Sequence, residues 1–207
     1  MLVGFSLALV SQKVVGFAQS HELGLFQWIH LSSVAQAILT IVIFDLVLYG
    51  WHWANHWSRF LWRFHRTHHS DREMDATSAF RFHFGEIAMA AVLRVGLIFL
   101  LGPKFNAILL YETLLFCVVQ FHHSNISLGA LDKFLAVLIV TPDIHRVHHS
   151  RVRSETDSNY SSLLSVWDRV FRTRNYREDQ HEIELGLREL GEEKNQTVSG
   201  LLKTPLQ

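Results

Sequence analysis

Two copies of a histidine-rich motif indicate where the chemistry of this chain takes place. Residues 65–70 read His-Arg-Thr-His-His-Ser, and residues 145–150 repeat them as His-Arg-Val-His-His-Ser. A neutral imidazole offers a lone pair at physiological pH, which makes histidine the commonest metal ligand among side chains. Because helix positions i, i+3 and i+4 share one face, each copy can direct three imidazoles toward one point.

Two smaller groups of histidines accompany the repeated motif. His52 and His56 are four residues apart just upstream of the first copy, and His122 and His123 are adjacent between the copies. Packing requirements rarely produce such a repeat, so we interpret the four groups as the lining of a cage for two metal ions. The candidate ligands are His52, His56, His65, His68, His69, His122, His123, His145, His148 and His149.

The ligand types narrow the choice of metal without deciding it. The single cysteine, Cys117, cannot form a thiolate cluster, and the apolar runs lack the Glu-x-x-His motifs of a carboxylate-bridged di-iron bundle. Imidazole suits zinc, copper, iron and nickel, and zinc hydrolases need only three protein ligands per ion. Two octahedral ions with an open position for oxygen could use this many histidines. We therefore expect iron, although the ligand count alone does not exclude zinc.

The composition indicates a membrane protein. Of the residues, 49% are hydrophobic and 18% charged, and the mean hydropathy is +0.15. The net charge is zero, so no general attraction to nucleic acid is expected. Residues 31–50 contain Asp45 as their only charge and are predicted to span the membrane, which needs roughly 20 apolar residues. Residues 86–101 and 105–121, joined by Gly-Pro-Lys, are predicted to form a membrane hairpin.

The shorter segments complete a topology in which every histidine group reaches the same side. Residues 1–17 are predicted to be a short first membrane element, residues 18–30 an interfacial segment with Phe26 and Trp28 at the membrane surface, and residues 128–141 a shallow or re-entrant helix. The arginines of residues 58–72 suggest that the shared side is cytoplasmic. Arg94 and Glu112 are expected to pair across the hairpin rather than extend separately to the interface.

The predicted fold is therefore all-α: an integral membrane, multi-pass helical bundle with a cytoplasmic, histidine-rich di-metal cap. We expect an N-terminal membrane or interfacial segment at residues 1–30, a catalytic domain at 31–174 and a cytoplasmic tail at 175–207 that partly docks. His21, His30 and His181 are isolated, and we interpret them as surface or core residues. His83 precedes the hairpin. It could be a metal ligand or form a hydrogen bond to a metal ligand, and the alternative is that it has no role in the metal site.

The motifs resemble those of the fatty acid hydroxylase/sterol desaturase superfamily of membrane di-iron oxygenases, most of all its bacterial sterol-desaturase-type branch. The resemblance extends from about residue 40 to 175. Trp53 and Phe84 stand where that branch often has Arg and Pro, and the N-terminal segment looks short of that branch's usual first membrane helices. The matching motifs are Asp45-x-x-x-Tyr49-x-x-His52-x-x-x-His56, residues 61–71, Arg81-Phe82-His83, His123-Ser124-Asn125, residues 141–150, Asp157-x-Asn159-Tyr160 and Trp167-Asp168-Arg169-Val170-Phe171.

The resemblance implies that these histidines bind two iron ions, with His122 as a tenth candidate. Between His122 and His123 we favour His123, because it belongs to the His-Ser-Asn motif and adjacent helical residues point about 100° apart. Asp45, Asp71, Asp157 and Asn159 are candidates to accept a hydrogen bond from a ligand's second ring nitrogen.

The resemblance also implies an oxidoreductase of lipid biosynthesis. It would abstract hydrogen from a C–H bond of an acyl or sterol-like lipid that enters from the bilayer, using dioxygen and giving an alcohol or an alkene. Electrons would come from a separate ferredoxin or cytochrome b5 type donor with its reductase. Two alternatives stay open: a membrane zinc-binding protein without redox activity, which would be an inactive relative, and a metal transporter. Transport would favour ligands near the middle of the membrane.

Overall fold

The computed structural model describes the backbone of residues 2–207 and the side chains of residues 11–207. Within these residues the regular structure is helical, apart from two isolated β-bridges. The long helices are α1 (Leu2–Ser20), α3 (Ser33–Trp57), α5 (Phe84–Leu101) and α6 (Phe105–His123). The short elements are α2 (Leu25–Trp28), α4 (Arg59–His69), η1 (Ser78–Phe80), α7 (Ala130–Leu135), α8 (Pro142–His148), α9 (Arg153–Thr156), α10 (Val166–Val170), η2 (Gln180–Glu182), η3 (Arg188–Leu190), α11 (Glu193–Gln196), α12 (Val198–Lys203) and η4 (Thr204–Leu206).

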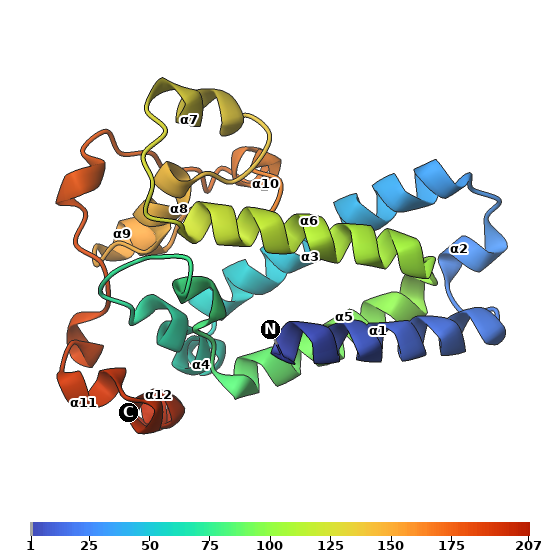
Figure 1. Ribbon diagram of the computed structural model, residues 1–207, viewed down its shortest axis with the longest axis horizontal. Coiled ribbons are helices and arrows are strands. Elements are labelled where there is room, and N and C mark those ends of the chain that lie inside the picture. Colours follow the sequence, from blue (N-terminus) through green and yellow to red (C-terminus); the bar gives the residue numbers. More distant parts are fainter. Residues whose placement is uncertain (1) are drawn as a thin grey trace.

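The long helices lie side by side, and the short helices gather mainly at the end where α3 finishes and α6 ends (Figure 1). In the part of the chain that the structure describes, three helices are long and apolar enough to cross a membrane: α3, α5 and α6. The predicted all-α membrane bundle with a histidine-rich end is confirmed. We call that end the cap.

Helix α3 is longer than predicted and carries the first histidine pair into the cap. It begins at Ser33, where the Ser32 hydroxyl accepts a hydrogen bond from the Ala35 amide, and it ends at Trp57. Ser58 then caps two helices at once, because its hydroxyl accepts the Leu61 amide of α4 while its own amide donates to Ala54 of α3. This corner turns α4 back beside the end of α3, so the histidines of the two helices meet.

The predicted hairpin is confirmed. Helix α5 stops at Gly102, whose φ of 63° is the left-handed conformation that glycine adopts without a side-chain clash, and Pro103 follows. The Arg94 guanidinium and the Glu112 carboxylate form an ion pair of 2.7 Å between the two helices, as expected. Ser11 of α1 also donates to Glu112, at 3.2 Å, which fixes α1 against the hairpin.

The prediction for residues 18–30 is wrong for Phe26. Trp28 is exposed, but Phe26 is buried in the main core cluster rather than placed at the membrane surface. Gln27 donates to the Gly102 carbonyl at 2.8 Å, which holds α2 against the hairpin turn. A side chain at Gly24 would lie 2.2 Å from the Gly102 amide, so this close approach needs glycine. The approach turns Phe26 inward.

The prediction of a short first membrane element concerns residues 1–17. The backbone of α1 is helical from Leu2 to Ser20, and the side chains of residues 1–10 lie outside the described part of the chain.

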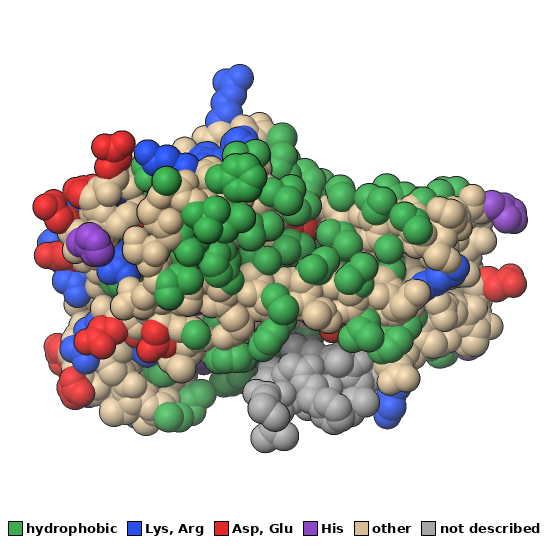
Figure 2. Space-filling model, turned by 45° about the horizontal axis from the view of Figure 1, so that its top comes forward, with side chains coloured by type: hydrophobic (Ala, Val, Ile, Leu, Met, Phe, Trp, Pro, Cys, Tyr) green, Lys and Arg blue, Asp and Glu red, His purple; other side chains and the backbone are tan. Residues whose placement is uncertain are grey.

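Hydrophobic side chains cover the long helices on the face shown in Figure 2, whereas most charged side chains gather at the cap end. The segment around α7 adds to the apolar surface, since Leu131, Phe134, Val137 and Leu138 are each at least half exposed. Such a face suits a helix that enters the membrane only partway, as predicted for residues 128–141.

The C-terminal segment docks on the cap over much of its length. Ile183 and Leu185 are buried in a cluster with Met74 and Val147, which lies inside the second histidine motif. Arg66 of α4 donates to the carbonyls of Thr204 and Gln207. Residues 175–207 therefore cover the outer side of the cap.

Candidate metal centre

Nine of the ten candidate histidines converge into two groups. Within each group, one ring nitrogen of every member lies within 4.8 Å of one ring nitrogen of every other member, and all nine residues are buried. Two ligands on opposite sides of one ion are about 4.2 Å apart when each metal–nitrogen bond is about 2.1 Å long. We call the groups site A, with His52, His56, His65, His69 and His148, and site B, with His68, His123, His145 and His149.

The two copies of the repeated motif are shared between the sites in a crossed manner. The first copy gives His65 and His69, four residues apart, to site A and sends His68 to site B. The second copy does the reverse, giving His145 and His149 to site B and His148 to site A. The expectation that all three imidazoles of a copy reach one point is therefore wrong. At about 100° per residue, the i+4 ring lies about 40° to one side of residue i and the i+3 ring about 60° to the other side, so the i+3 ring can reach a second site. Each copy therefore bridges the two sites.

The sites are neighbours within one enclosed cluster. The rings of His69 in site A and His149 in site B stack with centroids 4.6 Å apart. The His68 ring of site B lies 5.4 Å from the His69 ring and 4.6 Å from the His149 ring. Ions held at both sites would therefore be close enough to act on one small molecule together.

Hydrogen bonds to the cap fix the proton of five of these rings on Nδ1. Each of the five donates from Nδ1 to an oxygen atom, and a neutral imidazole has only one N–H, so its Nε2 keeps a lone pair. The donors and acceptors are His52 to the Tyr160 carbonyl at 2.8 Å, His56 to the Asp157 carboxylate at 3.2 Å, His65 to the Glu86 carboxylate at 2.8 Å, His123 to the Val119 carbonyl at 2.8 Å and His148 to the Ser158 carbonyl at 2.6 Å.

These lone pairs fit a cation. The Nε2 atoms of His52, His56 and His148 are buried and have no hydrogen-bond partner among the described residues. The Nε2 of His123 lies 3.2 Å from that of His68 and 3.0 Å from that of His145. Buried acceptors without a donor cost free energy, and a metal ion at each site would satisfy them.

Burial also keeps the rings of the short cap helices in the form that binds metal. It holds the pKa of His68, His69, His145 and His149 well below the usual 6.5, and neighbouring imidazoles lower these pKa values further. Burial likewise lowers the pKa of His148 to about 3, although its hydrogen bond to Ser158 acts in the opposite direction. These imidazoles are neutral at pH 7 and so offer lone pairs.

His122, the tenth candidate, belongs to neither group. It is buried, and its ring stacks on that of His145 with centroids 4.0 Å apart. It lines the cavity described below, beside its neighbour His123, which is a member of site B. His122 is therefore placed next to the metal centre without being one of the converging rings.

Five further residues were predicted as ligands or as hydrogen-bond partners of ligands. One of them contacts a converging histidine, and the other four form hydrogen bonds with the backbone or with other side chains. Asp157 contacts His56. His83 caps α5 by accepting the Gly85 amide on Nδ1 and donates from Nε2 to the Leu202 carbonyl. Asp45 accepts hydrogen bonds from Trp167 and the Leu164 amide, Asp71 accepts from Ser78, and Asn159 donates to the carbonyls of Ile144 and Asn175.

Sequence reasoning missed Glu86, which is the closest carboxylate partner of a candidate ligand. Glu86 is buried in the first turn of α5 and accepts from His65, while the Asn55 amide lies 3.5 Å from the same oxygen. Its presence as the only acidic residue of an apolar run, close behind His83, was the available signal. The carbonyl partners of His52, His123 and His148 have no signal in the sequence, because every residue has a carbonyl.

We predict that Glu86→Ala weakens metal binding about 10- to 100-fold, because the His65 ring loses the group that orients it and holds its proton on Nδ1. Glu86→Gln keeps an oxygen acceptor at nearly the same place and should lose much less. Competition with a chromophoric chelator measures both affinities. Equal affinities for Glu86→Ala and the unchanged protein would show that Glu86 does not support His65.

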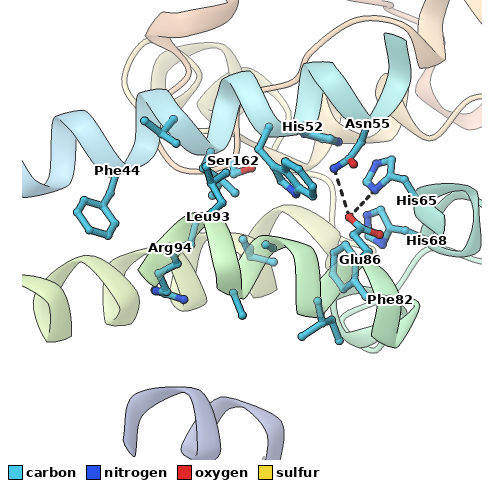
Figure 3. Close-up of a pocket in the computed structure, with 18 of the residues that line it drawn as sticks. Phe44, His52, Asn55, His65, His68, Phe82, Glu86, Leu93, Arg94 and Ser162 are labelled. Atoms are coloured by element: carbon cyan, nitrogen blue, oxygen red, sulfur yellow. Dashed lines mark hydrogen bonds and ion pairs between the residues drawn. The ribbon is translucent and has the colours of Figure 1, made fainter. Parts of the chain in front are cut away.

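A largely apolar cavity of about 310 Å³ leads from the metal centre along the membrane helices. His52, His65, His68, His122, His123 and His145 line one part of it, and Phe44, Leu97 and Tyr111 line another. Figure 3 shows Glu86, Asn55 and His65 at one end, with Arg94 and Phe44 toward the other. From Glu86 to Leu97, α5 rises about 16 Å.

The cavity also reaches the apolar surface of the bundle. Leu93, in the middle of α5, lines the cavity and is 38% exposed. An apolar molecule dissolved in the surrounding bilayer can therefore contact the cavity from the side.

Residues 37–173 match the fatty acid hydroxylase family. Among curated proteins, the chain is 32% identical to ornithine lipid hydroxylase OlsE of Rhizobium tropici over 140 residues, which are 67% of this chain and 41% of that protein. It is 32% identical to human alkylglycerol monooxygenase over 62% of this chain and 28% of that protein, and 33% identical to the Xenopus tropicalis protein of the same name over 65% and 29%. The chain thus spans less than half the length of these relatives. No solved structure gives a significant match.

Proposed function

This chain belongs to the fatty acid hydroxylase family, and from that membership we propose that it is a membrane oxygenase that hydroxylates a C–H bond of a lipid with dioxygen. Relatives named as a lipid hydroxylase and as monooxygenases support hydroxylation as the reaction, and desaturation is the other outcome to be tested. The converging imidazoles of sites A and B are the observation that carries the proposal, because they could hold two metal ions next to an apolar cavity.

The proposed ligands are the nine histidines of sites A and B, and the proposed metal is iron, two ions per chain. Bound iron would supply the binding and activation of dioxygen at positions that the imidazoles leave open. Zinc would fit imidazole ligands equally well but has no redox chemistry. We further propose that the chain crosses the membrane several times, with the cap on the cytoplasmic side, where arginines such as Arg59 and Arg63 flank α3.

The overall reaction would be R–H + O2 + 2 e− + 2 H+ → R–OH + H2O. The substrate C–H bond breaks and a C–O bond forms, and the second oxygen atom leaves as water with two protons. The two electrons must come from outside the chain, which carries no flavin or dinucleotide motif. An external protein donor of ferredoxin or cytochrome b5 type would supply them.

The protein's own residues would bind and orient the lipid. The apolar walls formed by Val47, Leu48 and Leu97 would hold an acyl or similar chain and exclude water from the reacting carbon. Glu86 and Asp157 would keep the protons of His65 and His56 on Nδ1, so that both Nε2 atoms stay available to the metal. A chain lying along α5 would present one stretch of carbons to the rings of His68 and His123.

Incorporation of labelled oxygen tests the proposed function. Protein loaded with iron without oxygen and placed in nanodiscs of bacterial membrane lipids is given a chemical reductant and 18O2. We expect a lipid product heavier by one 18O atom, formed in proportion to the iron bound. Tightly held zinc, with no oxygen consumed and no labelled lipid, would instead identify an inactive zinc-binding relative. A product lighter by two hydrogen atoms would identify a desaturase.

We predict that Ala90→Phe lowers lipid turnover about 10- to 100-fold, because Ala90 lines the cavity and a phenyl ring there would fill space needed by the chain. Ala88→Phe is the matched control, since Ala88 lies on the same helix but is exposed. Product formation is measured by mass spectrometry, and iron content should be unchanged in both variants. If Ala90→Phe turns over lipid as fast as Ala88→Phe, the chain does not bind in this cavity.

A further inference from the structure

One aromatic side chain connects site A to the protein surface on a route that avoids the cavity. Trp62 of α4 is half-buried, and its ring centroid lies 5.0 Å from that of His56 and 5.4 Å from that of His69. The cavity is lined by other rings of the centre, including His52 and His65, rather than by these two. Trp62 therefore touches the centre at a place where no substrate chain needs to pass.

The surface above Trp62 is linked to the same histidine by hydrogen bonds. The Arg153 guanidinium lies over the Trp62 ring, 5.0 Å from its centroid, and donates to the Asp157 carboxylate at 2.5 Å and to the His56 carbonyl at 3.3 Å. Asp157 in turn accepts from Nδ1 of His56. The Arg153 side chain is 58% exposed. A molecule that contacts Arg153 from solvent is thus linked to His56 of site A through the Trp62 ring and the Asp157 carboxylate.

This surface is positively charged. On α4, Arg59 lies three residues before Trp62 and Arg63 lies one residue after it, and both arginines are exposed. Within the described side chains, neither forms an ion pair with a carboxylate, whereas Arg153 pairs only with Asp157. Arg59 and Arg63 thus add two exposed guanidinium groups on α4 to the Arg153 guanidinium over the Trp62 ring, and among the described side chains Asp157 is the carboxylate that pairs with one of the three. We call Arg59, Trp62, Arg63 and Arg153 the Trp62 surface.

We propose that the Trp62 surface is the docking site of an acidic one-electron carrier protein and that electrons pass from the carrier to site A across the Trp62 ring. The proposal rests on the proposed function, whose reaction consumes two electrons. Each carrier molecule loses one electron and leaves oxidised, so two successive carriers supply both electrons. Electron transfer slows steeply with distance, which favours the place where a polarizable ring touches both the surface and two site A histidines. Complementary charge would orient the carrier there.

The binding half of the proposal is tested with charge reversal. The probe is a reduced plant-type [2Fe–2S] ferredoxin with an acidic surface, added to the iron-loaded protein in nanodiscs of uncharged lipid. Arg63→Glu should weaken binding about tenfold and flatten its dependence on salt, because one favourable charge contact becomes repulsive. Lys104→Glu makes the same charge change at the far turn of the hairpin and should leave the affinity unchanged. Equal affinities for Arg63→Glu and Lys104→Glu would overturn the docking site.

Anionic lipid is the competing partner for these arginines, and the same variants separate the two. If Arg63→Glu leaves ferredoxin affinity intact but lowers the retention of anionic lipid by the purified protein, the surface binds the membrane and the proposal fails. If ferredoxin affinity falls in uncharged nanodiscs, the contact is with the carrier protein itself.

The electron-transfer half is tested at Trp62. In stopped-flow mixing, Trp62→Leu should slow oxidation of bound ferredoxin at least tenfold, while the ferredoxin affinity and the iron content stay as in the unchanged protein. Trp62→Phe, which restores an aromatic ring, should recover part of the rate. An unchanged rate in Trp62→Leu would overturn the path. A purely structural role for Trp62 would instead lower iron content in both variants.

The outcome is distinguishable from failure of the proposed function. One outcome contradicts only the docking proposal: the protein oxidises lipid with photoreduced deazaflavin as the reductant, but substitutions at Trp62 and Arg63 change neither the affinity for ferredoxin nor the rate of its oxidation. A protein that oxidises no lipid with either reductant contradicts the proposed function.

Discussion

His123→Phe is expected to remove one of two bound metal ions and to abolish lipid oxidation, whereas His122→Phe should keep both ions. The two residues are adjacent and both imidazole rings are buried, but only His123 has a ring nitrogen among the converging atoms of site B. Phenylalanine preserves the ring and removes both nitrogens, so the comparison isolates ligation from packing. Site B has four histidines, and losing one leaves three with an additional open position.

The expected loss of activity for His123→Phe is about 10³-fold or more, since metal activation contributes several kcal/mol to the transition state. Metal per chain is measured by mass spectrometry after anaerobic purification, and lipid turnover by labelled oxygen. His122→Phe should bind two ions; because His122 lines the cavity, its metal content rather than its rate is the readout. Two ions retained in His123→Phe, or one lost in His122→Phe, would mean that the assignment of His123 to site B is wrong.

Removal of metal is expected to lower the thermal unfolding midpoint by about 10 °C or more. Without an ion, the buried Nε2 lone pairs of His52, His56 and His148 have no hydrogen-bond donor among the described residues, and their burial is no longer compensated. Ions that bind only the folded protein stabilise it according to their free concentration and affinity. For a chain of this size, 1 kcal/mol shifts the midpoint by about 2–4 °C, so a loss of several kcal/mol gives the expected change.

The measurement is a thermal scan in detergent with and without chelator, followed by titration of ferrous iron into the stripped protein. The midpoint should return and then rise with the logarithm of the free iron concentration. Unfolding of a membrane protein in detergent is often irreversible, so equal scan rates are needed. A stripped protein that melts within about 2 °C of the loaded one would contradict a metal-held cap.

The sequence identified the histidines because their spacing carries information by itself. The i, i+3 and i+4 positions predicted one shared face for each copy of the motif, and the structure brings nine of the ten candidates together. The sequence did not predict that one histidine of each copy belongs to the site formed mainly by other segments, as His68 does in site B and His148 in site A. This crossed sharing depends on the angle at which α4 and α8 meet, which is set by packing rather than by the motif.

The hydrogen-bond partners of the candidate ligands were predicted less well, because sequence spacing does not show which elements meet in space. Asp157 was anticipated and contacts His56, but Asp45 instead anchors the loop at Leu164 and Trp167. A carboxylate near the motif in sequence need not be near it in space. Glu86 lies on another helix and reaches His65 only because the α4–α5 connection folds back.

The membrane helices were predicted from composition, because an apolar run of sufficient length has few alternatives. The Arg94–Glu112 pair followed from their symmetric positions about the turn. Phe26 was misplaced because its burial depends on the contact between Gly24 and Gly102, two residues far apart in the sequence. Such long-range contacts do not appear in local hydrophobicity.

Mössbauer spectroscopy of the 57Fe-loaded, anaerobically purified protein, with total iron determined on the same sample, tests the central claim most directly. Two imidazole-rich groups within one buried cluster predict two ferrous ions per chain, in distinct environments that reflect five ligands in site A and four in site B. Both signals should change together when dioxygen is admitted. A sample that takes up no iron, or a single ion indifferent to dioxygen, would contradict an oxygenase built on this pair of sites.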